Sequence, residues 1–213
     1  MHTGPAPASA RFGRMTLLRR LAGMLLAGFS LAGAAAPALP PHEYAIFSAL
    51  LSHGLSPEAR QAVIADTTTG DPARIVSGRA TEARAQELHT TTELLREWTR
   101  LNQRTFELAH EFVLPLPYAL FSEADRDLLF RGDEPVAGWL SFFERYPGSD
   151  GVIRLSRAAL DRTGTHALVY LELECGPECG SGRLVHLQRG EDAAWGVEGG
   201  ELIWIAGPTA GAP

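Results

Sequence analysis

The sequence contains no lysine and only two cysteines among its 213 residues. Its 19 basic residues are therefore all arginines. Together with the many alanines, glycines and prolines, this indicates a GC-rich bacterial genome rather than a mechanism. The two cysteines are too few for a zinc framework of paired C-x-x-C motifs, so we expect no metal and no cofactor.

The sequence also lacks a long hydrophobic run. Its longest hydrophobic run, LAGMLLAGFSLAGAAA, is too short and too rich in Ala and Gly to form a stable membrane-spanning helix. This run follows four arginines, Arg11, Arg14, Arg19 and Arg20. The pattern predicts a signal peptide over residues 1–38, with Met15 as an alternative start and cleavage between Ala34 and Ala38. A retained anchor helix is the alternative, but we expect no stable membrane anchor.

Positive charge is scarce in the remaining chain. Removing the four leader arginines leaves 15 arginines against 25 acidic residues, a net charge of about −10. Such a chain repels phosphate backbones and anionic lipid surfaces, so we expect no nucleic-acid partner. Residues 39–206 are long enough for a single domain with a sizeable core, and residues 207–213 are predicted to be a disordered tail.

The N-terminal half of this domain shows helical periodicity. Apolar side chains share one face of a predicted helix over HEYAIFSALLSH (42–53), and QAVIADTTTG (61–70) predicts a short buried strand. Residues 71–79 are predicted to be a loop. Leucines and Trp98 recur at helical spacing from Ala80 to about Leu108, which predicts the longest helix.

The middle of the chain contains clear start signals. Pro115 and Pro117 cannot donate ladder hydrogen bonds, so the extended segment EFVLPLPYALF belongs at a sheet edge. Ser122 and Asp125 form a predicted capping box at the start of SEADRDLLF. Pro135 opens a further helix, whose aromatic stripe we expect to pack in the core.

Beyond Gly151 the period changes to two. The segments GVIRLSR, THALVYLELEC, RLVHLQR and AWGVEGGELIWI are separated by turn sequences, which predicts an antiparallel meander. The fold class is therefore α+β, with N-terminal helices packed on a curved antiparallel sheet that the C-terminal β-meander mainly forms.

Several of these segments together resemble a family of uncharacterised exported bacterial proteins. The shared pattern is an aromatic-rich helix, YPGS-x-G, L-S-R, ALVY, CG-x-x-CG-x-G and a lone tryptophan before the last strands. Upstream, EYAIFSALL and VIADTT match the family's opening helix and first strand. The resemblance covers about residues 43–69 and 139–205. It implies the fold and export, and it transfers no catalytic residue.

The hairpin over residues 166–189 supplies the leading candidate for an active site. A register that sets apolar against apolar side chains places Leu173 opposite Val185. The same register places Glu172 opposite His186 and Tyr170 opposite Gln188, on the other face of the hairpin. Glu172 and His186 would then be an acid/base pair, with Tyr170 beside them. The alternative is a solvated cross-strand ion pair that has no catalytic role.

The two cysteines, Cys175 and Cys179, allow three interpretations. In an oxidising compartment they pair, and the turn between them permits a disulfide that staples the hairpin. A redox-active pair is the second interpretation, although C-x-x-x-C is one residue longer than the thioredoxin-like motif. A metal site is the third, but with His186 it has only three ligands.

Recognised catalytic constellations are otherwise missing from the sequence. It contains no G-x-S-x-G elbow and no glycine-rich phosphate loop that leads into a helix. We therefore expect an exported, periplasmic or secreted, non-enzymatic domain that binds an unknown protein or small ligand through a sheet face or the hairpin tip. A hydrolase-like enzyme using Glu172 and His186 is the first alternative, and a thiol-disulfide redox protein is the second.

Overall fold

A computed structural model describes residues 38–69, 72–76, 81–132 and 134–207 of the chain. The predicted signal peptide, except for Ala38, and the predicted tail beyond Gly207 lie outside these residues. The described helices are α1 (Pro41–Gly54), α2 (Ala73–Val76), α3 (Thr81–Glu87), α4 (Thr92–Leu101), α5 (Glu123–Leu129) and α6 (Pro135–Arg145). The strands are β1 (Ala62–Ala65), β2 (Tyr118–Phe121), β3 (Val152–Leu155), β4 (Ala159–Leu160), β5 (His166–Gly176), β6 (Cys179–Arg189) and β7 (Trp195–Ala206).

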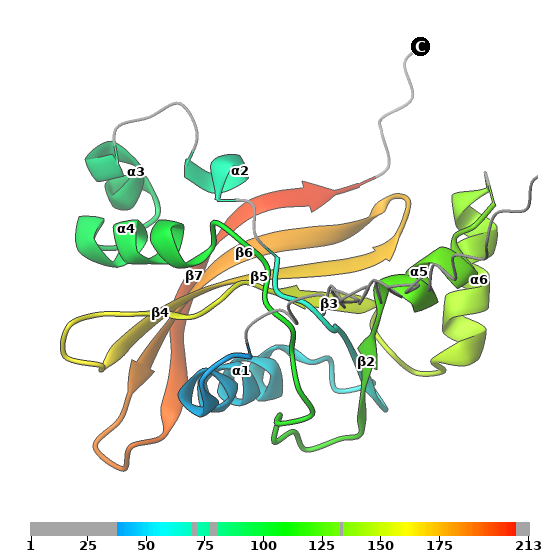
Figure 1. The fold of residues 1–213 in the computed structure, drawn as a ribbon, viewed down its shortest axis with the longest axis horizontal. Helices are drawn as coiled ribbons and strands as arrows, with labels where there is room; N and C mark the ends of the chain where they lie inside the picture. Colours follow the sequence, from blue (N-terminus) through cyan, green and yellow to red (C-terminus); the bar gives the residue numbers. More distant parts are fainter. Residues whose placement is uncertain (1–37, 70–71, 77–80, 133, 208–213) are drawn as a thin grey trace, which may run out of the picture. The chain divides into compact units, whose positions relative to one another are not determined.

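The strands form one mixed sheet in the order β2-β1-β3-β5-β6-β7, and β4 pairs with β5 (Figure 1). The pairs from β3 to β7 are antiparallel, so the α+β class and the predicted C-terminal meander are confirmed. The β1 strand instead pairs in parallel with β2 and β3. The sequence pattern did not predict these parallel pairs, because strand direction depends on the course of the intervening chain.

Helices cover both faces of the sheet (Figure 1). We call one face the α1 face, because α1 packs there against odd-numbered residues of β5 and β6 such as Val169 and Leu187. We call the other the α4 face, because α3 and α4 pack there against even-numbered residues such as Leu168 and Leu184. The aromatic stripe of α6 packs against β1, β2 and β3, as predicted for a core element.

The predicted long helix from Ala80 to Leu108 is wrong. The structure divides this segment into α3 and α4, and α4 ends at Leu101. His89 has a φ of 48°, a left-handed conformation that interrupts a helix. Thr91 then caps α4, because its hydroxyl accepts a hydrogen bond from the backbone N–H of Leu94 at 3.1 Å. The longest described helix is α1, with 14 residues.

The start signals in the middle of the chain are confirmed. Ser122 and Asp125 form both bonds of the capping box at the start of α5, and Pro135 is the first residue of α6. The β2 strand follows Pro115 and Pro117 and lies at one edge of the sheet. The β7 strand forms the other edge, and it is irregular at two points where its register with β6 shifts.

Candidate binding surface

The register of the β5–β6 hairpin differs from the prediction. Its turn is only two residues long, because Gly176 pairs with Cys179, and this shortens the return path. Val169 therefore lies opposite Val185, and Tyr170 lies opposite Leu184. The offset from the predicted pairing is four residues. Because this number is even, each side chain remains on the face that the alternation predicts.

The predicted pairing of Glu172 with His186 is therefore wrong. Glu172 lies opposite Gly182, and His186 lies opposite Leu168. Four residues of strand separate the two positions along the sheet, which is about 13 Å at the usual rise. The two side chains share a face but cannot exchange a proton directly.

His186 contacts the turn between α3 and α4 instead. Its Nε2 lies 3.2 Å from the carbonyl oxygen of Leu88. Burial lowers the pKa of His186, and the Leu88 carbonyl, Glu198 and Glu201 only partly oppose this shift. The imidazole is thus a half-buried packing group that holds this turn against β6.

Tyr170 belongs to a contact that the sequence did not reveal. The indole Nε1 of Trp204 donates a hydrogen bond to its hydroxyl oxygen at 2.6 Å. A Cβ atom at Gly182 would lie 2.2 Å from both of these atoms, so a side chain there cannot coexist with the pair. A Cβ atom at Gly180 would lie 3.1 Å from the indole ring. The two glycines after Cys179 therefore make room for Trp204 on the α4 face.

The two acidic side chains of β5 on this face, Glu172 and Glu174, are buried or take part in ion pairs. Glu174 accepts a hydrogen bond from Arg126 of α5 at 2.7 Å, and its other oxygen lies 3.4 Å from Arg154 Nε. The second distance is that of an ion pair rather than of a hydrogen bond. Glu172 is only 6% exposed and lies opposite Arg154 in the β3–β5 ladder. These groups join α5 and β3 to the hairpin, so neither Glu172 nor Glu174 is an open acid/base group.

The cysteine pair forms the predicted disulfide. Cys175 and Cys179 are bonded, with 5.0 Å between their Cα atoms. Gly151 lies beside this bond with a φ of +132°, and a Cβ atom there would be 3.0 Å from the Cβ atom of Cys175. The glycine that ends YPGSDG is thus required by close packing against the stapled turn.

A second buried network contains Ser156 and Arg157 of the L-S-R segment, and no motif in the sequence predicted it. Arg157 bonds the carboxylate of Glu43 through Nε at 3.1 Å and through a second nitrogen at 2.5 Å. The backbone N–H of Ala158 donates to the other Glu43 oxygen at 2.9 Å. Glu43 is only 1% exposed. The pair therefore attaches α1 to the segment after β3.

Ser156 extends this network toward α4. Its hydroxyl accepts hydrogen bonds from the indole Nε1 of Trp98 at 2.9 Å and from the backbone N–H of Tyr170 at 2.8 Å. Asn102 accepts from the backbone N–H of Arg157 at 2.7 Å. Since these polar groups are buried and bonded to one another, they support the fold rather than a reaction.

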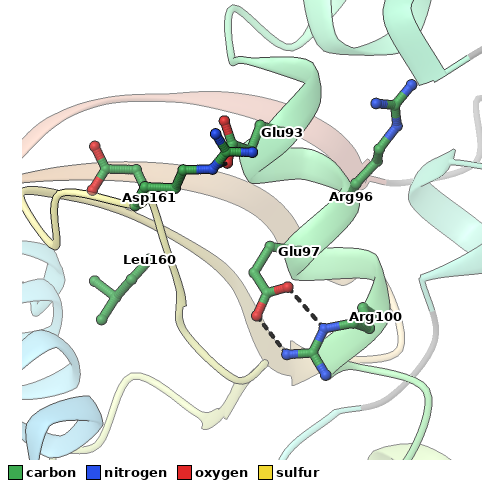
Figure 2. A pocket seen from close by; sticks show the side chains of 7 residues that line it. Glu93, Arg96, Glu97, Arg100, Leu160 and Asp161 are labelled. Carbon is green, nitrogen blue, oxygen red and sulfur yellow. Dashed lines mark hydrogen bonds and ion pairs between the residues drawn. The ribbon is translucent and has the colours of Figure 1, made fainter.

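A charged groove of about 530 Å³ lies between α4 and the segment after β4 (Figure 2). Its acidic side chains already have partners: Glu97 accepts hydrogen bonds from two of the three guanidinium nitrogens of Arg100, at 2.6 and 2.8 Å, and Glu93 pairs with Arg162. Burial raises the pKa of Asp161, but hydrogen bonds from Thr163 and His166 outweigh it and hold this pKa well below its usual range. The groove is therefore a set of compensated surface ion pairs.

A further unusual feature is a mainly apolar area on the α1 face, near the end of the stapled hairpin. We call it the tip surface and define it as Leu171, Leu173, Arg183, Leu202 and Ile205. Cross-strand pairing aligns Leu171, Arg183 and Leu202 in one row, and Leu173, Ser181 and Ile205 in the next. Leu202 is 50% exposed and Ile205 is 69% exposed.

The tip surface adjoins a small crevice at the C-terminal end of α1. The crevice has a volume of about 40 Å³. It is lined by Leu51, Gly54, Leu55, Asp150, Ile153, Leu171 and Leu173. Asp150 is anchored there by the hydroxyl and the backbone N–H of Ser56, at 2.7 and 3.1 Å. An exposed apolar area that continues into a crevice is typical of a docking site.

The chain matches no protein-family model, no curated protein and no solved structure at a significant level. Within the part of the chain that the structure describes, no helix is long and apolar enough to cross a membrane. The same part contains no group of three or more acidic, histidine or cysteine residues placed to hold a metal ion. Function must therefore be inferred from the surfaces of this chain alone.

Proposed function

We propose that this chain is an exported, non-enzymatic binding domain that docks a partner protein on the tip surface. The observation that carries the proposal is the exposure of Leu202 and Ile205 on the same face of the sheet as Leu171 and Leu173, which line the crevice. Large aliphatic side chains gathered around a crevice lose water-exposed area when a partner covers them, which favours association.

The position of the tip surface supports this role. The Cys175–Cys179 disulfide closes the hairpin, and Gly151 packs against it, so the surface lies on a cross-linked element. Preorganised surfaces lose less conformational entropy on binding. The ion pairs on the α4 face bind the other side of the same strands to α5 and β3. Contacts on the α4 face thus fix in place the hairpin strands that carry part of the tip surface.

Export has two independent supports. The leader pattern predicts a signal peptide, and the disulfide is of the kind that persists in the periplasm or outside the cell. We infer that the mature domain works in one of these oxidising compartments.

Thiol-disulfide exchange is a second candidate, because Cys179 is exposed and its bond is open to an attacking thiol. The reduction potential of the pair, measured by titration against a thiol/disulfide buffer with intact-mass detection, decides this candidate. A potential below about −300 mV identifies a structural staple, whereas about −120 to −230 mV identifies a working oxidoreductase.

The docking proposal is tested by selecting binders from a peptide library displayed on phage against the mature protein. The double variant Leu202→Ser/Ile205→Ser removes the exposed aliphatic groups. The control Val113→Ser/Leu140→Ser changes two residues of similar exposure, 78% and 63%, elsewhere on the chain. We expect selected peptides to lose at least tenfold in affinity for the tip variant and to keep their affinity for the control. Selected peptides that bind the tip variant with unchanged affinity would place the docking site elsewhere.

A further inference from the structure

Arg183 is an exposed cation in the centre of the aliphatic tip surface. It lies between Leu171 and Leu202 across the sheet. Most described arginines have acidic partners, such as Arg126 with Glu174 and Arg157 with Glu43. Among the described residues, Arg183 is exposed and forms no hydrogen bond or ion pair. In a chain with far more acids than arginines, an unpaired guanidinium within an apolar area indicates an acidic group on the partner.

We propose that the tip surface binds an extended peptide segment of the partner that carries an aliphatic side chain and, two residues later, a carboxylate. This inference rests on the proposed docking function and specifies the chemistry of the partner. The aliphatic side chain enters the crevice, and the carboxylate pairs with Arg183. Arginine is well suited to this contact, since its planar fork matches the geometry of a carboxylate.

The size of the crevice sets the first requirement. A crevice of about 40 Å³ holds about three water molecules, which together match one aliphatic side chain. The lining is aliphatic except for Asp150, whose carboxylate is already bonded to Ser56. The crevice therefore accepts a leucine-sized group rather than an aromatic ring or a charge.

The cross-strand geometry sets the second requirement. Leu171 lines the crevice and lies directly opposite Arg183, so their Cβ atoms are about 5 Å apart. In an extended segment, residues i and i+2 point to the same side and lie about 7 Å apart. An aliphatic residue at i and Glu or Asp at i+2 therefore reach the crevice and the guanidinium together, whereas adjacent residues point to opposite sides.

A second copy of this chain fits the tip surface poorly. A two-fold axis at this surface would bring the unpaired Arg183 of both copies together, and like charges in an interface are unfavourable. Extension of the sheet is also disfavoured. The β7 edge shifts register twice and carries Glu198 and Glu201, and the β2 edge has only four residues.

The test uses amide-capped and acetylated nonapeptides with a central Leu-Ser-Glu and glycine-serine flanks. Their binding to isotope-labelled mature protein is followed by NMR titration. We expect chemical-shift changes at the tip surface. Replacing Glu by Gln should weaken binding roughly three- to fivefold, as for an exposed ion pair. Replacing Leu by Ala should weaken it about tenfold. The order Leu-Glu-Ser, which breaks the i, i+2 spacing, should bind like the Gln peptide.

The variant Arg183→Gln should abolish the preference for Glu over Gln and leave the Gln peptide's affinity unchanged. Arg131→Gln, at an exposed arginine beyond α5, is the matched control and should keep the preference. Equal affinity for Glu and Gln peptides at the tip surface would overturn the acidic specificity while the docking function stands. Absence of shifts for every peptide at millimolar concentration also overturns this inference, and the library selection then decides the docking function separately.

One further peptide distinguishes an internal segment from a chain terminus. It ends in leucine with a free α-carboxylate and contains no Glu. If only this peptide binds, the partner presents its C-terminus, and the proposed internal i, i+2 segment is wrong. We expect it to bind no better than the Gln peptide.

Discussion

Near its tip, the β5–β6 hairpin presents mainly aliphatic side chains on the α1 face and charged and aromatic side chains on the α4 face. The α4 face bears charged and aromatic groups such as Glu174 and Trp204, and these are bonded to neighbouring elements. The α1 face bears aliphatic groups, and α1 covers only part of them, so that the neighbouring tip surface remains exposed. The difference shows that a titratable side chain indicates a functional site only if its contacts leave it available for a ligand. Here the exposed apolar side chains, rather than the carboxylates, indicate a functional surface.

The comparison between buried and exposed ion pairs is tested most strongly at Glu43. We expect Glu43→Ala to lower the free energy of unfolding by about 3–5 kcal/mol, because it leaves Arg157 largely buried without its counter-ion. Urea denaturation of the mature protein measures the change. Glu97→Ala, which breaks an exposed pair, should cost less than about 1 kcal/mol. Equal costs for the two variants would show that burial does not distinguish the pairs.

The α4 face is tested at Gly182. We expect Gly182→Ala to cost about 1–3 kcal/mol, because its Cβ atom would overlap Tyr170 and Trp204 and force them apart. Gly199→Ala in β7 is the control, since no atom lies within 4 Å of the added Cβ. Thermal unfolding and tryptophan fluorescence report the two variants. A neutral Gly182→Ala would mean that the indole does not need this space.

The stapled turn offers a comparison between the presence and the absence of a cross-link. We expect Cys175→Ala/Cys179→Ala to lower the free energy of unfolding by about 2 kcal/mol, the loop-closure value for a five-residue ring. Reduction of the unmodified protein should produce a similar loss, as measured by urea denaturation with and without reductant. A loss well above this value would show that the disulfide also stabilises the folded packing around Gly151 and the tip surface.

The smallest effect is expected at His186. Burial lowers its pKa in the folded protein below the ordinary value of 6.5, so the folded state binds fewer protons than the unfolded state. Its contribution is therefore fully present above about pH 6.5 and is lost as the pH falls toward the folded pKa. One group changes stability by at most about 1.4 kcal/mol per pH unit.

The difference in unfolding free energy between the unmodified protein and His186→Gln, measured from pH 7.5 to 5, isolates this contribution. We expect the difference to shift against the unmodified protein as the pH falls. A difference that is constant with pH would show that His186 does not titrate differently on folding.

Local signals in the sequence predicted many elements correctly. The capping box of α5, the proline start of α6, the edge position of β2 and the period of two beyond Gly151 each depend on residues close together in the chain. The split between α3 and α4 was missed, because His89 adopts a left-handed conformation that helical spacing does not reveal. The register failed because it depended on apolar matching, whereas the two-residue turn at Pro177 and Glu178 decided it.

The candidate surface was predictable only in part. The sheet face and the hairpin tip were named as binding regions, but Leu202, Ile205 and Arg183 were not. The run ELIWI reads as an ordinary strand, and nothing in it shows that two of its side chains stay exposed. Glu172 and Tyr170 were placed on the correct face, yet their contacts with other elements depend on residues distant in sequence.

The sequence by itself determined which side chains share a face, because the alternation of side chains follows from the local geometry of an extended backbone. It also favoured pairing of the two cysteines, because the leader pattern predicts export to an oxidising compartment. Only the tertiary structure decided which part of β3 and β5 the helix α1 covers, and hence that Leu171 and Leu173 border an open crevice. That boundary arises from packing between Leu51 and residues about 120 positions later, and no local rule encodes such a contact.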